Sequence, residues 1–316
     1  MLGGTPQGGW PERASELLRR VAQRRPLVHH VTNLVTMHAV ANATMAVGAL
    51  PVMALAPEEI PEIAESASCV VINLGTPTLP SLQAAQAAMA QAARRGLPVV
   101  VDPVGVAASR WRLQAAQRLL AYPVAAIRAN PAEAAALAGE RVGETWVQRG
   151  VESVVQVPAA AASARGAASE QDQVSPVETQ ELARRRAVAC ALARRVRAVA
   201  AVTGQVDVVA SPPGEAPGEG GVTLGVFNGH PWFSAVSGSG CMATAVVAAF
   251  AAVAEPEHRP QAVACALAVY GLAGERAAAR CPGPGTFLHA LMDELHALAV
   301  LARRGEAIRG VRVGVV

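Results

Sequence analysis

The sequence predicts an α/β protein in which helices cover both faces of a mostly parallel sheet. Short runs rich in Val and Ile alternate along the chain with Ala-rich stretches of helical spacing, and this order is typical of parallel strands joined by helices. The runs are apolar at nearly every position, as expected of strands buried on both faces. Hydrophobic residues make up 52% of the 316 residues and charged residues 16%, which provides a large core and excludes a disordered chain.

The first half of the chain supplies most of the predicted parallel strands. Residues 11–25 have the spacing of an amphipathic helix. SCVVINL (68–74) and LPVVVD (97–102) are predicted strands, and the Ala- and Gln-rich residues 79–95 between them form a predicted helix. AAIRA (125–129) is the next predicted strand, so strands and helices alternate throughout this part of the chain.

The second half of the chain adds strands at one side of the sheet. Residues 198–210 (AVAAVTGQVDVVA) supply further strands, preceded by a helix. VTLGVF and PWF flank Asn228-Gly229-His230, and because Asn-Gly favours tight turns we predict a hairpin here. The C-terminal residues 311–316 (VRVGVV) are a candidate edge strand.

Two segments have the composition of surface insertions. Residues 158–177 are low in complexity and rich in Ala, which predicts a mobile segment. Residues 211–221 (SPPGEAPGEGG) must form a loop, because Pro and Gly prevent regular structure there. Neither segment separates two independent cores, and the sequence has no internal repeat. We therefore predict one domain that spans residues 1–316.

The charged residues exclude several classes of function. The 27 basic and 24 acidic residues give a net charge of +3, and every basic residue is Arg. The absence of Lys excludes a Walker-type phosphate loop and a Schiff-base lysine, since both need the amine. Nearly balanced charge and only 3% aromatic residues argue against a nucleic-acid partner, which requires a basic surface and stacking rings.

The cysteine usage and the apolar runs predict a cytoplasmic protein without a membrane partner. Five cysteines are an odd number and have no metal-binding spacing, which fits a reducing compartment. The N-terminus carries no signal peptide. The uncharged runs at 27–57 and 236–254 are rich in Ala and interrupted by polar residues or glycine, so a buried core is favoured over a membrane span.

The sharpest local signal is SGSGC (237–241), which opens an uninterrupted run of small apolar residues. A glycine-rich turn at the start of a helix presents free backbone N–H groups, here those of Gly238, Ser239 and Gly240, and a positive helix end. Such a site suits a phosphate group and requires no Lys. The alternative is a tight turn that only starts a core helix, because short glycine-rich turns are common.

Cys241 lies where this predicted helix begins. The field of a helix N-terminus lowers the pKa of a thiol, so we expect a lowered pKa at Cys241 and the ability to accept a proton from a hydroxyl. The alternative is a small buried apolar residue, which is our reading of Cys69, Cys190 and Cys265.

Two carboxylates form a second group of candidate functional residues. Asp102 ends the VVVD strand, at the edge of the sheet where parallel α/β proteins bind ligands. Glu133 follows Asn130-Pro131, a pattern that favours a helix capping box over any other role. If both carboxylates reach one site, they could hold Mg²⁺ through waters beside a nucleotide triphosphate.

Three further groups are candidates for the same pocket. Arg128 lies inside an apolar strand, where burial requires either a phosphate or an internal ion pair. Thr203 and Gly204 end a strand and could bind a phosphate or form a plain turn. His29, His30 and His38 have no carboxylate in a metal-binding spacing, so we read them as core or pocket-lining groups.

Taken together, these segments resemble the hydroxyethylthiazole kinase family of the ribokinase-like kinases. The resemblance covers about residues 15–300, and its motifs occur in the family's order. Cys at the end of SGSGC resembles the thiazole kinases, whereas sugar and hydroxymethylpyrimidine kinases carry Asp there. The motifs are PLVHHVTNLVTMHAVAN (26–42), GALPVMA (48–54), INLGT (72–76), VVVDPVG (99–105), AAIRANPAE (125–133), VTGQVD (202–207), NGH (228–230), SGSGC (237–241) and GPGTF (283–287).

The resemblance implies a three-layer ribokinase-like fold and transfer of the γ-phosphoryl group of ATP, with Mg²⁺, to 4-methyl-5-(2-hydroxyethyl)thiazole in thiamine synthesis. It also implies a homotrimer with active sites at the subunit interfaces. On the thiazole side, the resemblance implies that Met53 and Gly238 contact the thiazole and that Asn33, Gly75 and Thr76 line the pocket. On the ATP side, it implies that Arg128 and Thr203 contact ATP and that Asp102 and Glu133 lie near the metal. By the same resemblance, Cys241 stands at the position of the base.

Three other functions compete with this reading. The first is a kinase of the same fold that acts on hydroxymethylpyrimidine or pyridoxal, and the second is a ligand-binding relative without catalysis. The third is a thiol-dependent hydrolase built on Cys241, for which His230 is the only histidine near in sequence. Cys in place of Asp at position 241 disfavours the first alternative, and intact carboxylates disfavour the second.

Overall fold

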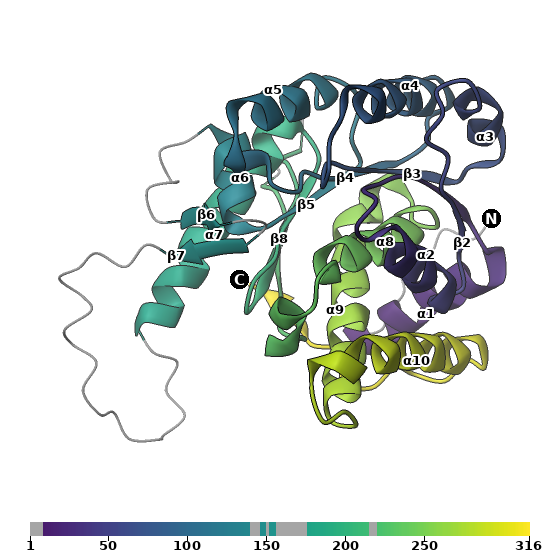
Figure 1. Ribbon diagram of the computed structural model, residues 1–316. Coiled ribbons are helices and arrows are strands. Elements are labelled where there is room, and N and C mark those ends of the chain that lie inside the picture. The colour runs from purple at the N-terminus through teal and green to yellow at the C-terminus, as the bar shows by residue number, and fades with distance from the viewer. Residues whose placement is uncertain (1–8, 140–145, 150–151, 156–175, 215–219) are drawn as a thin grey trace.

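The computed structural model describes residues 9–139, 146–149, 152–155, 176–214 and 220–316 (Figure 1). Within these residues a nine-stranded sheet has the strand order β11-β10-β9-β8-β5-β4-β3-β1-β2. Its strands are β1 (Leu27–Val31), β2 (Leu50–Val52), β3 (Cys69–Asn73), β4 (Val99–Asp102), β5 (Ala126–Ala129), β8 (Val199–Val202), β9 (Asp207–Ala210), β10 (Thr223–Val226) and β11 (Val313–Val315).

Helices cover both faces of this sheet, as Figure 1 shows. One face is covered by α3 (Ile60–Ser66), α4 (Leu79–Arg95), α5 (Arg110–Leu119), α6 (Pro131–Ala138) and α7 (Pro176–Val196). The other face is covered by α1 (Trp10–Arg24), α2 (Met37–Ala46), α8 (Ser239–Ala251), α9 (Arg259–Ala278) and α10 (Pro284–Arg303). A separate two-stranded sheet pairs β6 (Trp146–Arg149) with β7 (Glu152–Val155).

In the main sheet, the neighbouring strands β2, β1, β3, β4, β5 and β8 pair in parallel. The pairs β8–β9, β9–β10 and β10–β11 are antiparallel. β3 and β4 are buried at every position, because helices cover them on both faces. Asn73 at the end of β3 pairs in register with Asp102 at the end of β4. This pairing brings two polar side chains together at the carboxyl edge of the sheet.

Most predicted elements are confirmed. The predicted helices at 11–25 and 79–95 correspond to α1 and α4, and the predicted strands at 68–74, 97–102 and 125–129 to β3, β4 and β5. Residues 198–210 form the two antiparallel strands β8 and β9, and β11 is the predicted edge strand.

The predicted hairpin at Asn228-Gly229 is wrong. β10 pairs with β9 and β11, and PWF belongs to a 3₁₀ helix, η4 (Pro231–Ala235). The Asn228 side chain is buried instead of forming a turn. Its Nδ2 donates to the carbonyl of Gly310 at 2.9 Å, and its Oδ1 accepts from the backbone N–H of Arg312 at 2.7 Å. These long-range bonds override the local preference of Asn-Gly for a hairpin turn.

The two predicted insertions are only partly described. Residues 158–175 lie outside the described residues, and residues 176–177 begin α7. Residues 211–214 and 220–221 are irregular, as predicted, and residues 215–219 are outside the described part. Among the residues that the structure describes, no helix is both long and apolar enough to cross a membrane. The apolar run at 236–254 contains α8, which is buried against the sheet.

Candidate active site

Polar side chains from several chain segments meet at the carboxyl edge of the parallel strands. Asn73 ends β3, Asp102 ends β4, Arg128 lies near the end of β5 and Thr203 follows β8. The N-terminus of α8 lies beside the same edge, since α8 packs on β3 and β4. This is the place where open parallel sheets bind ligands.

The first turn of α8 has the geometry expected of an anion site. Its N-cap residue is Gly238, with φ of +83°, and no side chain described in the structure caps the first turn by a hydrogen bond. A Cβ atom at position 240 would lie 2.3 Å from Nη1 of Arg128. Only Gly240 therefore allows the guanidinium to approach the backbone of this turn so closely. The backbone N–H of Ser239 makes only a long hydrogen bond, of 3.5 Å, to the carbonyl of Val236. The combination of a helix N-terminus and a cation favours a bound anion.

Arg128 is held between Thr203 and Asp102. Its Nη2 donates to Oγ1 of Thr203 at 2.7 Å, and its Nη1 lies 3.8 Å from Oδ1 of Asp102. The internal ion pair that the sequence allowed is therefore present, at the long end of such distances. Nε of Arg128 is buried without a hydrogen-bond partner, which leaves donor capacity for a ligand.

Two amide groups hold the sulfur of Cys241. Nδ2 of Asn73 lies 3.2 Å from Sγ, and Nδ2 of Asn33 lies 3.6 Å from it. Burial, followed by the charge of Asp102, raises the pKa of Cys241 to about 11. The expectation of a lowered pKa is therefore wrong, because desolvation beside a carboxylate outweighs the helix N-terminus. The free protein holds this group as a neutral thiol at pH 7.

Asp102 is the most buried carboxylate of the site. Its Oδ2 accepts hydrogen bonds from Nδ2 of Asn73 at 3.0 Å and from Oγ1 of Thr244 at 2.9 Å. Its Oδ1 is buried without a hydrogen-bond partner. Burial raises the pKa of Asp102, although Arg128 opposes this shift. An additional cation beside Oδ1 would stabilise the charged form.

Glu133 forms the capping box that its sequence pattern favoured. Its Oε2 accepts from the N–H of Asn130 at 2.9 Å, while the side chain of Asn130 accepts from the N–H of Glu133. Its Oε1 accepts from the N–H of Gly105 at 2.7 Å. Burial and the nearby charge of Asp102 raise the pKa of Glu133 to about 7. Glu133 thus has a structural role, and its charge also acts on Arg128.

The two carboxylates fit a magnesium ion held partly through water. Mg²⁺ prefers one or two carboxylates and keeps several of its waters, and Oδ1 of Asp102 has no competing hydrogen bond. Within the described residues no group of three or more His, Cys, Asp or Glu side chains is arranged to hold a metal. The donor set therefore suits an ion that a phosphate ligand helps to bind, rather than a metal caged by protein alone.

Apolar side chains form a wall around the thiol. Val40, Ala245 and Cys241 make a small buried cluster, against which Met53 and Val104 pack. Next to it, the N–H of Gly75 donates to Oδ1 of Asn73 at 2.9 Å. A small ligand with an apolar ring would therefore meet apolar side chains on one side and polar groups on the other.

Asn73 and Thr244 are site residues that the sequence interpretation missed. Asn73 donates to both Asp102 and Cys241, and Thr244 donates to Asp102. The position of Asn73 at the end of a predicted strand, like Asp102, is the signal that could have identified it. Thr244 lies three residues after Cys241, on the same face of α8.

The histidines do not take part in this network. His29 and His30 are fully buried and bond to the carbonyl of Ala54 and to Oγ1 of Thr44, respectively. His38 is exposed on α2, so it is not a core residue. Nδ1 of His230 accepts from the backbone of Trp232, and the described residues include no hydrogen bond from His230 to Cys241. The hydrolase alternative therefore lacks its base.

Comparison with known proteins shows the family of this chain. The chain matches the family described as "Hydroxyethylthiazole kinase family" over residues 18–180 and, in a second match, over residues 168–300. The chain belongs to the hydroxyethylthiazole kinase family. Its relatives include the hydroxyethylthiazole kinases of Desulforudis audaxviator, 42% identical over 90% of this chain and 91% of that protein, and of Rubrobacter xylanophilus, 42% identical over 91% and 93%.

Solved structures support the same assignment. The structure of a hydroxyethylthiazole kinase protein from Pyrococcus horikoshii is similar, with a TM-score of 0.75 and 33% identity over 96% of this chain and 99% of that chain. A hypothetical protein from Streptococcus mutans, 12% identical with a TM-score of 0.53, covers 89% of this chain and 98% of that chain and shares the fold alone. The three-layer ribokinase-like fold expected from the resemblance is confirmed.

Proposed function

We propose that this family member transfers the γ-phosphoryl group of ATP to the primary hydroxyl of 4-methyl-5-(2-hydroxyethyl)thiazole, which yields the thiazole phosphate for thiamine synthesis. The observation that carries the proposal is the first turn of α8, where a helix N-terminus without a side-chain cap, the Arg128 guanidinium and the Cys241 thiol lie together. Phosphoryl transfer needs chiefly positioning and neutralisation of charge. The groups at this turn suit both tasks.

The polar half of the site would bind the phosphates of ATP. In this proposal the N–H groups of Gly238, Ser239 and Gly240 form an anion hole for the transferring phosphoryl group. Arg128, oriented by its hydrogen bond to Thr203, adds positive charge at the same place. Arg donors in a fixed fork suit phosphate oxygens.

Asp102 and Glu133 would hold Mg²⁺ on the phosphate side of the site. When bound there, Mg²⁺ would supply neutralisation of the negative charge on the ATP phosphates. Oδ1 of Asp102 is the free acceptor for this purpose, and Glu133 contributes through water because both of its oxygens already accept backbone hydrogen bonds.

The apolar half of the site would bind the thiazole. Met53 packs on the cluster that contains Cys241, and Gly238, Asn33 and Gly75 would complete the pocket around the ring and its hydroxyethyl arm. Cys241 would accept the proton of the hydroxyl group. Since its thiol is neutral in the free protein, this step depends on a minor thiolate population.

Product identification tests the proposed reaction. Wild-type protein is incubated with ATP, Mg²⁺ and the thiazole alcohol, and the phosphorus products are resolved by ³¹P NMR. We expect ADP and a phosphate monoester of the thiazole in equal amounts. ATP hydrolysis to inorganic phosphate without an ester would contradict the proposed acceptor. No turnover at all would contradict the proposal and support a relative that only binds ligands.

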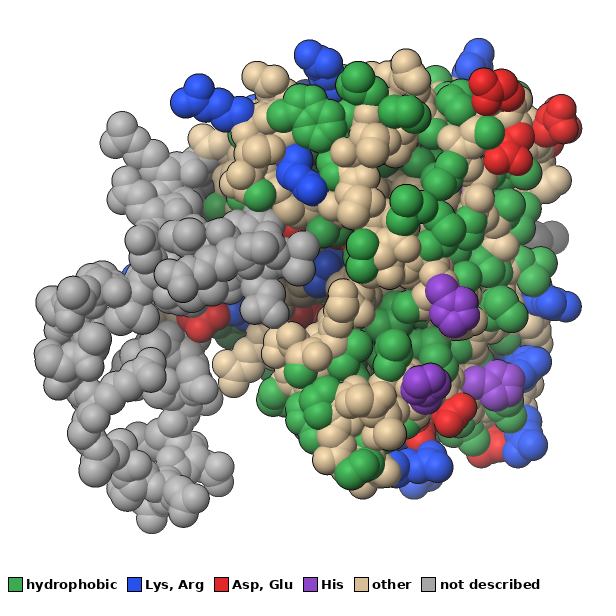
Figure 2. All heavy atoms as spheres, in the orientation of Figure 1, with side chains coloured by type: hydrophobic (Ala, Val, Ile, Leu, Met, Phe, Trp, Pro, Cys, Tyr) green, Lys and Arg blue, Asp and Glu red, His purple; other side chains and the backbone are tan. Residues whose placement is uncertain are grey.

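We further propose that the protein is a cytoplasmic homotrimer. Four exposed apolar side chains lie close together in the chain: Leu34 and Val35 in the loop before α2, Met45 in α2 and Leu50 in β2. Figure 2 shows hydrophobic side chains on the face that carries these elements. Exposed apolar groups next to a site are typical of a subunit interface. Sedimentation equilibrium should give three times the mass of one chain, and a monomer at micromolar concentration would contradict the proposal.

A further inference from the structure

One side of α9 forms a support beneath the SGSGC turn. Four residues of α9 face the same side of the helix, because they form two pairs that are each one helical turn apart. The pairs are Tyr270 with Gly274 and Gly271 with Glu275. We call these four residues the α9 support. Residues 227–239, which lead from β10 into α8, pack along it.

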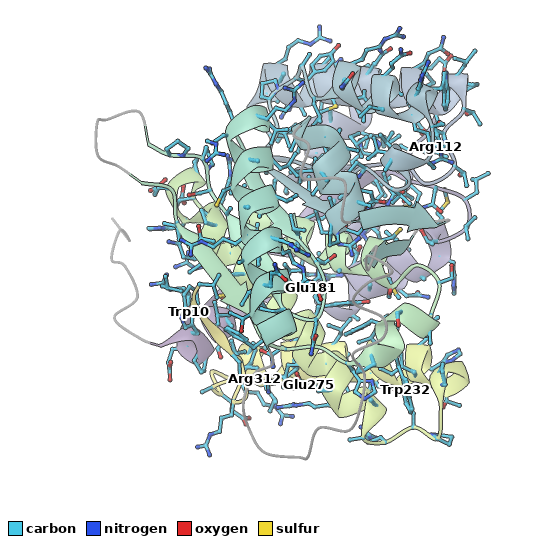
Figure 3. The ribbon with its side chains drawn as sticks, turned by 90° about the vertical axis from the view of Figure 1, so that its left-hand side faces the viewer. Trp10, Arg112, Glu181, Trp232, Glu275 and Arg312 are labelled. Atoms are coloured by element: carbon cyan, nitrogen blue, oxygen red, sulfur yellow. The ribbon has the colours of Figure 1, made fainter. Side chains whose placement is uncertain are left out.

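Glu275, at the C-terminal end of the α9 support, fixes the start of the segment 227–239. Oε1 of Glu275 accepts from the backbone N–H of Gly229 at 2.8 Å and from Nδ2 of Asn228 at 3.3 Å. Arg312 donates to the same carboxylate at 2.7 Å, and Figure 3 shows Glu275 and Arg312 side by side. The charged acceptor is thus satisfied from several directions, which makes this anchor strong.

The middle of the α9 support holds Phe233 of η4. A Cβ atom at position 274 would lie 2.3 Å from the Phe233 ring, so the ring can occupy this place only because the residue is glycine. The same ring stacks on Tyr270, with centroids 4.8 Å apart and an interplanar angle of 20°. Phe233 therefore has one well-defined position between two residues of α9.

Tyr270, at the N-terminal end of the α9 support, contacts the SGSGC turn (237–241) itself. The Tyr270 hydroxyl donates to the carbonyl of Ser239 at 2.8 Å. Oγ of Ser239 donates to the carbonyl of Phe233 at 2.6 Å. Ser239 is therefore fixed at both its carbonyl and its side chain, and its hydroxyl is already engaged within the protein.

We propose that Tyr270 is a positioning residue for phosphoryl transfer, which acts through Ser239 to aim the N–H groups of the SGSGC turn. This inference rests on the proposed function, because an anion hole stabilises the transferring group only when its donors are aimed at it beforehand. Tyr270 is buried, and burial raises the pKa of its hydroxyl. The hydroxyl thus remains a neutral donor over the whole range of physiological pH.

The substitution Tyr270→Phe tests the inference because it removes the hydroxyl and keeps the ring that stacks on Phe233. We expect kcat to fall by about tenfold or more, with KM for the thiazole alcohol changed by less than about twofold. The amides of residues 237–242 should exchange with deuterium faster than in the wild type. Tyr122→Phe is the matched control, since Tyr122 is the only other tyrosine of the chain and follows α5, apart from the SGSGC turn.

The two readouts separate this inference from the proposed function. Unchanged exchange at 237–242, or a kcat within twofold of the wild type, would overturn the role of Tyr270. Hydrogen exchange needs no turnover, so it reports on the turn even if the wild type fails to phosphorylate the thiazole, in which case the proposed function is what fails. If Tyr270→Phe does not fold, Phe233→Leu removes the ring that stacks on Tyr270 and so loosens the position of its hydroxyl, and it should show the same change in exchange.

Discussion

The Cys241 thiol shows how burial and a helix terminus compete at a single residue. A helix N-terminus stabilises a thiolate, but the sulfur of Cys241 is buried beside Asp102, and the pKa rises to about 11. Asn73 and Asn33 donate to the sulfur, which orients it without ionising it. If the thiol is the base, its small ionised fraction limits the rate at neutral pH.

Substitution of Cys241 tests its role directly. We expect Cys241→Ala to lower kcat by about 10²–10⁴ and Cys241→Asp to keep or raise it, because a carboxylate ionises at a much lower pH than a thiol. Steady-state kinetics of both variants, with circular dichroism to verify folding, make the measurement. A loss below about tenfold in Cys241→Ala would assign the residue to packing alone.

Asn73 is the second residue whose substitution is informative. Asn73→Ala removes the donors to Cys241 and Asp102 together, so the thiol and the carboxylate lose their common orientation. We expect kcat to fall by about tenfold to a hundredfold, as measured by ATP consumption. Gln83→Ala, at an exposed position of α4 on the other face of the sheet, is the control. An equal loss in that variant would point to a general structural effect.

Sequence interpretation at this scale identified the residue types but missed their environments. Asp102, Arg128 and Cys241 stand at element ends that the alternation of strands and helices makes visible. The raised pKa of Cys241 depends on contacts with segments up to 208 residues away, and no local pattern contains that information. The contacts of Asn73 with Asp102 and Cys241 are also distant in sequence, at 29 and 168 residues, so only its position at the end of a predicted strand could have identified it.

At the scale of elements, the conformation of the N-terminus of α8 depends on Gly238 and Gly240 and on the guanidinium of Arg128. Gly240→Ala would place a methyl group 2.3 Å from the present position of Nη1 of Arg128, so the guanidinium must move away from the turn. We expect KM for ATP to rise about tenfold, equivalent to ~1.4 kcal/mol.

The matched control for this substitution is Gly285→Ala. Gly285 holds the second position of α10, as Gly240 does in α8, and a Cβ atom there meets nothing within 4 Å. Its kinetics should equal those of the wild type. Equal effects of the two substitutions would show that Gly240 matters only for helix propensity.

Elements were predictable where the pattern is strong and local. The buried runs of β3, β4 and β5 and the capping box of α6 follow from the sequence. The hairpin expected at Asn228-Gly229 failed because Asn228 bonds to Gly310, Arg312 and Glu275. Those partners lie 47 to 84 residues away, so tertiary contacts decided the conformation.

At the scale of the whole molecule, buried histidines make stability depend on pH. His30 is fully buried, and burial together with the neighbouring His29 lowers its pKa from 6.5 to about 3. The unfolded chain therefore takes up a proton on His30 as pH falls below 6.5, and the folded chain does so only near pH 3. The free energy of unfolding should decrease by up to ~1.4 kcal/mol per pH unit in this window.

Urea unfolding at pH 7.5, 6.0 and 5.0 measures this slope. In His30→Gln the slope should be smaller, because one group that binds protons preferentially in the unfolded state is gone. His38→Gln, at an exposed position of α2, is the matched control variant. An identical slope in the wild type and His30→Gln would show that other groups govern the acid response.

The proposal of a single domain belongs to the same scale. All nine strands of the main sheet hydrogen-bond to their neighbours in one continuous order, so we propose one cooperative unit that covers residues 1–316. Fluorescence and circular dichroism should then report coincident unfolding transitions. Two separated transitions would indicate that part of the chain unfolds independently.

The choice of alcohol tests the central claim most directly. ATP consumption with Mg²⁺ is measured in parallel against 4-methyl-5-(2-hydroxyethyl)thiazole, hydroxymethylpyrimidine and pyridoxal at equal concentrations. We predict turnover confined to the thiazole alcohol, because Met53 and Cys241 form the apolar side of its pocket. Turnover of the pyrimidine or of pyridoxal alone would contradict the assignment of the substrate and the weight given to Cys241, while the fold would stand.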